Sequence, residues 1–140
     1  MRHFITEADV RNFILDRTIE DNELQLDLTF SPEEIADAMM RAARDYNSLP
    51  PFVDSVTPPH LPGDTNLFLY GTAYHLFLSR IVKLTRNDID YTAGNVATNA
   101  VAKQIAHLKE LAVMMKQNFT DTATNIKMAI NVSACWGQIG

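Results

Sequence analysis

The sequence contains little cysteine, tryptophan or glycine. Its 140 residues include one cysteine, one tryptophan and five glycines. A single cysteine cannot form an intrachain disulfide, so a reducing compartment is compatible with this composition. Cys135 lies between Ala134 and Trp136, which offer neither a base nor a positive charge to activate a thiolate. We therefore interpret Cys135 as a small apolar residue and not as a nucleophile.

Positive charge is also scarce. The 12 lysines and arginines face 17 aspartates and glutamates, which gives a net charge of −5 at pH 7. The acidic excess lies in residues 1–50, which carry five basic and eleven acidic side chains. Binding to nucleic-acid phosphates needs clustered basic residues, so this composition argues against strong DNA binding. The best candidate basic surface, made by Lys103, Lys109 and Lys116, is sparse and is diluted by Glu110.

Motifs that carry known site chemistry are missing as well. None of the four histidines is paired with Cys, Glu or another His at metal-ligand spacing. A calcium loop starting at Asp88 would need glycine and glutamate where Ala93 and Asn99 stand. No phosphate loop or dinucleotide fingerprint occurs. We expect a protein that is not an enzyme, with no catalytic residue, no metal site and no cofactor, and we interpret His75 as a hydrogen-bonded core residue.

No apolar run resembles a membrane span, and we expect neither a signal peptide nor contact with a membrane. The longest apolar stretch, residues 67–84, is interrupted by Gly71, Arg80 and Lys83. It predicts a buried central helix that begins near residue 65. A glycine inside a helix costs about 1 kcal/mol relative to alanine. We therefore expect another backbone to cross the helix at Gly71.

Helical periodicity covers most of the remaining chain. A first helix is predicted over residues 7–16 with Thr6 as its cap, and a second begins at Ser31, Pro32 and Glu34. The last helix is predicted over residues 98–129, where apolar residues recur at alternating steps of four and three. We predict an all-α fold: a small antiparallel bundle of about four helices, with a long C-terminal helix and an extended C-terminal arm. We expect residues 118–130 to project from the bundle, because the helix is longer than the domain is wide.

The last eleven residues, 130–140, contain no charged side chain, and they hold the only Trp and two of the five glycines. Chain ends are usually polar and frayed. Tryptophan is a favoured interface anchor, and glycine permits close backbone approach. We therefore divide the chain into a helical bundle domain (1–129) and an extended C-terminal docking arm (130–140). In the alternative interpretation the tail folds back and Trp136 fills the end of the bundle.

Four stretches carry a resemblance to a known family: RNFILDRTIEDNEL, SPEEIADAMMRAARDYNSLPPF, LFLYGTAYHLFLSRIVKLTRNDIDY and IKMAINVSACWGQIG. With these stretches the chain resembles the head-to-tail connector proteins of tailed bacteriophages, also called portal adaptor or neck proteins. The resemblance implies a structural virion protein that forms a ring of about twelve copies under the portal. Such a ring joins the capsid to the tail and lets DNA pass through its lumen.

The resemblance also implies partners and contact residues. The partners would be the portal protein, neighbouring copies in a homo-oligomeric ring and a downstream neck or tail protein, with DNA only as passing cargo. The location would be the virion neck, and the host cytoplasm during assembly. Two other functions stay open: a head-closure or tail-completion neck protein, and a DNA-binding packaging module similar to a small terminase subunit. The partner-binding residues expected in the arm are Ile130, Val132, Trp136, Gly137 and Ile139.

Overall fold

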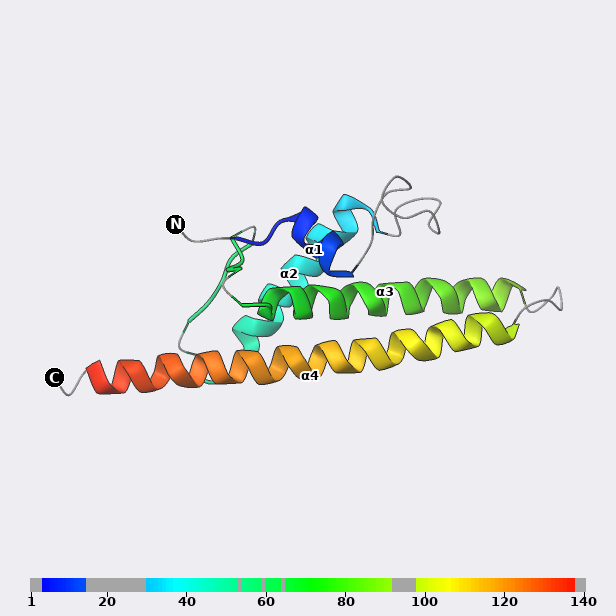
Figure 1. The fold of residues 1–140 in the computed structure, drawn as a ribbon. Coiled ribbons are helices and arrows are strands. Elements are labelled where there is room, and N and C mark those ends of the chain that lie inside the picture. The colour runs from blue at the N-terminus through cyan, green and yellow to red at the C-terminus, as the bar shows by residue number, and fades with distance from the viewer. Residues whose placement is uncertain are drawn as a thin grey trace.

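The described part of the chain forms four helices, and Figure 1 shows their arrangement. The computed structural model describes residues 4–14 and 30–137, apart from 53, 59, 64 and 92–97, and describes no side chains in 87–101 and 134–137. Within these residues there is no strand, so the predicted all-α bundle is confirmed. None of the described helices is both long enough and apolar enough to cross a bilayer. The helices are α1 (Glu7–Ile14), α2 (Pro32–Ser48), α3 (Leu67–Tyr91) and α4 (Thr98–Gly137).

The first two helices begin at the caps that the sequence predicts. The Thr6 N–H donates to Asp9 Oδ2 at 2.9 Å, and the Asp9 N–H donates back to Thr6 Oγ1 at 3.3 Å. At the start of α2, Ser31 Oγ accepts from the Glu34 N–H at 3.1 Å. These side chains satisfy backbone donors that a helix leaves without intrahelical partners.

Glu34 also joins the start of α2 to α3. Its Oε2 accepts a hydrogen bond from Lys83 Nζ at 2.8 Å. This bond, opposed in part by burial, holds the pKa of Glu34 below its ordinary value of 4.5. A lowered folded-state pKa stabilises the fold above the unfolded-state pKa, and this contribution is lost as the pH falls through the folded-state value. The pair therefore stabilises the fold at neutral pH and not in acid.

We expect Lys83→Met to lower the free energy of unfolding at neutral pH by less than about 1 kcal/mol, because both side chains are partly exposed. The loss should shrink to nothing at a pH below the folded-state pKa of Glu34. Urea unfolding at a series of pH values measures this difference. Lys109→Met, at an exposed position on α4, is the control and should show no such trend. An undiminished loss in acid would show that Lys83 stabilises the fold by packing.

The core lies where α2, α3 and the middle of α4 meet, with α1 packed against α2 and α3. The helices approach closely at Gly71: a Cβ atom built there would lie 2.9 Å from the Phe119 ring and 3.0 Å from the Ala42 methyl group. The sequence predicts a crossing backbone at this glycine. The structure instead places a ring from α4 and a methyl group from α2 in that space.

The buried face of α4 turns gradually around the helix. The sequence predicts a heptad stripe that continues from Phe119 through Thr122 and Ile126. The structure buries Ala123 and Lys127 fully, at four-residue steps from Phe119, whereas Thr122 and Ile126 are only partly buried. A straight helix has 3.6 residues per turn, so a 3.5-residue stripe drifts around it by about 20° per heptad. The expectation that all of residues 118–130 project is therefore wrong, because 119–127 pack on the bundle.

The ends of α4 extend past the short helices (Figure 1). With 40 residues, the helix is about 60 Å long. Its first half pairs with α3 beyond α1 and α2, and its last turns pass the start of α3. The prediction of an extended conformation from residue 130 is wrong, because α4 continues to Gly137. Neither proline nor glycine occurs between Ile130 and Trp136, so each residue can continue the helix. The division at residue 129 stays a prediction.

Candidate interaction surface on α3 and α4

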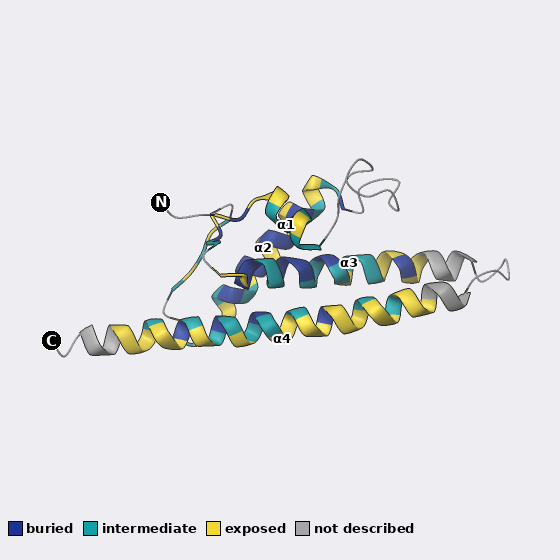
Figure 2. Cartoon of the chain, in the orientation of Figure 1, coloured by how far each residue is buried: buried dark blue, intermediate teal, exposed yellow. Residues whose placement is uncertain are grey.

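Large apolar side chains are exposed along α3 and α4 (Figure 2). The short helices leave much of the surface of α4 uncovered. Val113 on α4 is 65% exposed and Val82 on α3 is 56% exposed. Leu78 of α3 and Val113 of α4 line one groove, and exposed apolar side chains that gather in this way indicate an interaction site. Among the side chains that the structure describes, the large exposed apolar residues of these two helices are Leu78, Val82, Leu111, Val113, Met114, Met128 and Val132.

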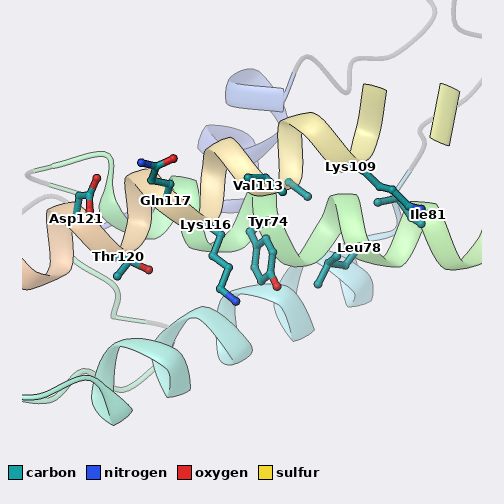
Figure 3. A pocket seen from close by; sticks show the side chains of 10 residues that line it. Tyr74, Leu78, Ile81, Lys109, Val113, Lys116, Gln117, Thr120 and Asp121 are labelled. Atoms are coloured by element: carbon teal, nitrogen blue, oxygen red, sulfur yellow. The ribbon is translucent and has the colours of Figure 1, made fainter. Parts of the chain in front are cut away.

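A groove of about 610 Å³ runs between α3 and α4 (Figure 3). Side chains from both helices meet in it because α3 and α4 are antiparallel neighbours. Apolar residues dominate it on the α3 side, and on the α4 side lysines and short polar side chains stand beside Val113. The groove is lined by Tyr74, Leu78, Ile81, Lys109, Ala112, Val113, Lys116, Gln117, Thr120 and Asp121.

Aromatic and charged groups fix the wall of this groove. The Lys116 ammonium lies 5.7 Å from the centre of the Tyr74 ring, a cation–π distance. The next residue, His75, joins its Nε2 to Asp45 Oδ2 of α2 at 2.6 Å. The hydrogen bond expected for His75 is thus confirmed, with its partner on α2, but the side chain is only partly buried and lies outside the core cluster. Together these contacts tie the groove wall to the bundle.

The lysines of α4 do not form one basic stripe. Lys109 and Lys116 both line the groove, and so does Asp121. Lys103 lies six residues before Lys109 on the same helix, which places it about 120° around the helix axis. Recognition of a phosphate backbone needs basic groups that share one face. The surface favours a mainly apolar partner over DNA.

The predicted partner-binding residues lie at the far end of α4, and Ile139 is outside the described residues. Ile130 is half-buried, whereas Val132 is 52% exposed. Two residues turn a helix by about 200°, so these two residues are on different sides. For Trp136 and Gly137 the structure describes the helical backbone alone. Position 136 follows Val132 by four residues and therefore lies on the same side of α4.

Sequence reasoning missed Lys127, a fully buried lysine of α4. Its Nζ donates to the Leu49 carbonyl at 2.7 Å and lies 4.4 Å from the centre of the Tyr46 ring. Both partners belong to the C-terminal end of α2, where carbonyl groups lack intrahelical donors. The sequence signal that could have indicated its burial is the four-residue spacing of Phe119, Ala123 and Lys127. Lys127 fixes α4 just before its exposed end.

A second set of hydrogen bonds holds the proline-rich segment after α2. The Tyr46 hydroxyl donates to Asp54 Oδ2 at 2.5 Å, and burial together with this bond raises the pKa of Tyr46 well above its ordinary value of 10. Asn47 donates to the Val56 carbonyl at 2.9 Å and accepts from the Val56 N–H at 2.8 Å. These bonds attach Asp54 and Val56 to the C-terminal end of α2.

Metal and family evidence adds no further site. No group of three His, Cys, Asp or Glu in the described part of the chain is placed to hold a metal ion.

Comparisons of the chain with family models, with curated proteins and with solved structures found no match.

Proposed function

We propose that this protein is a structural assembly subunit of a bacteriophage, a head-to-tail adaptor that forms a ring under the portal. One observation carries the proposal: α4 leaves the bundle at its C-terminal end and carries exposed apolar side chains there. Met128 and Val132, on its last turns, are 54% and 52% exposed. Burying such side chains against a partner is favourable by about 25 cal/mol per Å² of apolar area.

A ring suits such a surface because many copies act together. Each projecting helix end offers only a small contact, but linked copies bind with a high effective concentration. The groove between α3 and α4 offers a second, separate surface for contact. Two different surfaces on one chain are what a ring of three or more identical subunits requires.

The charge distribution supports DNA as passing cargo and not as a bound ligand. The chain carries a net charge of −5, and its α4 lysines are divided between different sides of the helix. A lumen that holds DNA tightly would slow its passage. A head-closure or tail-completion protein could share all these features, and its position in the particle would distinguish it.

Deleting residues 130–140 should leave the bundle folded and abolish incorporation into a ring on the portal. The deletion keeps Lys127 and every buried residue of the core, so the helical signal in circular dichroism and cooperative thermal unfolding should persist. Electron microscopy of portal complexes measures incorporation. Unfolding of the truncated protein would show that the tail belongs to the core. Normal incorporation would show that the tail is not a docking element.

A pair of point variants sharpens the same experiment. Val132→Asp introduces a carboxylate at an exposed apolar position of the last turns of α4, and Asn131→Asp introduces one at the neighbouring exposed position. An unpaired charge buried at an interface costs several kcal/mol. Only Val132→Asp should prevent incorporation, so equal effects of the two variants would argue against an apolar contact at residue 132.

A further inference from the structure

We propose that the end of α4 in one copy, residues 128–137, binds in the α3–α4 groove of a neighbouring copy. This inference rests on the proposed function in one respect, because it requires that copies of the chain associate. Beyond the proposed function, it names the two surfaces through which neighbouring copies make contact. The helix end is defined here as residues 128–137, and the groove by the ten lining residues given above.

The helix end has the properties of a helical ligand. It contains no charged side chain, since Lys127 is the last charged residue before Gly137. Met128 and Val132, four residues apart, are both about half exposed, and the helical backbone continues this register to position 136. Amphipathic helices bind grooves through apolar residues at such intervals.

The groove has the complementary properties. Leu78, Ile81 and Val113 provide apolar surface, and a helix is received by grooves that are apolar within and polar at the rim. Lys109 and Lys116 add positive charge. The C-terminal end of a helix carries a partial negative charge from its unpaired carbonyls. An uncharged helix that ends in such carbonyls therefore matches this groove in both apolar character and charge.

The groove cannot receive the helix end of its own chain. Its α4 side is formed by residues between Lys109 and Asp121, and the helix end continues the same uninterrupted helix. Met128 begins about 10 Å further along the axis, and α4 continues beyond that point to Gly137 in the same direction (Figure 1). Contact must therefore join two copies. If the contact is repeated head-to-tail it closes a ring or extends a filament, whereas a reciprocal contact between two copies closes a dimer.

Disulfide trapping between two variants of the full chain tests this contact. Both variants carry Cys135→Ala, one adds Val132→Cys and the other adds Val113→Cys. Mixing them under oxidising conditions should give a disulfide-linked heterodimer. The control replaces Val113→Cys by Met40→Cys, an apolar position on α2 that is 42% exposed. A heterodimer yield at least about tenfold above this control is expected, and equal yields would overturn the inference.

A second measurement separates this inference from the proposed function. Sedimentation of Val113→Asp should show self-association weakened by about tenfold or more relative to Met40→Asp. If rings form on the portal but no disulfide-linked heterodimer is trapped and Val113→Asp does not weaken self-association, the inference is overturned. The proposed function would still stand. Trapping between copies that never form rings on a portal would support the contact and overturn the adaptor function.

Discussion

Replacing Lys127 by alanine is expected to lower the free energy of unfolding by about 3 kcal/mol. The change leaves the Leu49 carbonyl without the donor that now lies 2.7 Å away, and an unsatisfied buried carbonyl costs about 1–3 kcal/mol. It also empties the space that the lysine stem fills beside Tyr46. Removing a buried positive charge offsets part of this loss. Urea unfolding followed by circular dichroism measures the difference.

Lys127→Met separates the two contributions, because methionine keeps most of the stem and lacks the donor. We expect a loss of about 1 kcal/mol for this variant. Lys116→Met is the control, since Lys116 is exposed and lies over the Tyr74 ring, and it should change stability by less than about 0.5 kcal/mol. If Lys127→Ala were as mild as this control, Lys127 would not join α4 to the end of α2.

Replacing Gly71 by valine is expected to destabilise the fold by about 3 kcal/mol. Even one added carbon would lie 2.9 Å from the Phe119 ring and 3.0 Å from the Ala42 methyl group, which is closer than such atoms pack. α3 would have to move away from α2 and α4 together, although valine is a slightly better helix former than glycine. Thermal and urea unfolding measure the loss.

A double variant identifies Phe119 as the cause of this loss. Phe119→Ala alone removes a buried ring and should cost about 3–5 kcal/mol. Combined with Gly71→Val, the total should be smaller than the sum by at least about 1 kcal/mol, because each change relieves the other. Ala36→Val, at an exposed position of α2, should cost less than about 1 kcal/mol. Simple additivity of the two core changes would contradict direct contact at Gly71.

The local features of the fold could be predicted from the sequence because their causes are local. Thr6 and Ser31 cap their helices through residues three positions away, and such motifs are visible in the sequence. Gly71 was identified as a point of close approach because glycine inside a helix needs a reason. What approaches it, the Phe119 ring, depends on how two helices pack.

The tertiary features could not be predicted in the same way. The hydrogen bond of Lys127 goes to Leu49, 78 residues earlier, and the four-residue spacing from Phe119 does not identify this partner. The groove depends on which sides of α3 and α4 face each other, and this follows from the drift of the buried face. The helical conformation of residues 130–137 was missed because glycine and tryptophan near the end were interpreted as signs of an extended arm.

Because α4 is one continuous helix, the distance of its C-terminal end from the bundle is fixed by the number of residues between them. The same helix pairs with α3, is anchored to the end of α2 by Lys127 and forms the exposed end. No hinge therefore separates these three parts. The height of the end above the bundle is set by residue number, at about 1.5 Å per residue. Inserting a single residue after Lys127 would raise the tip by that distance and swing Val132 through about 100°. An insertion in this part of α4 therefore changes both the distance of the C-terminal end from the bundle and the side of the helix on which Val132 lies.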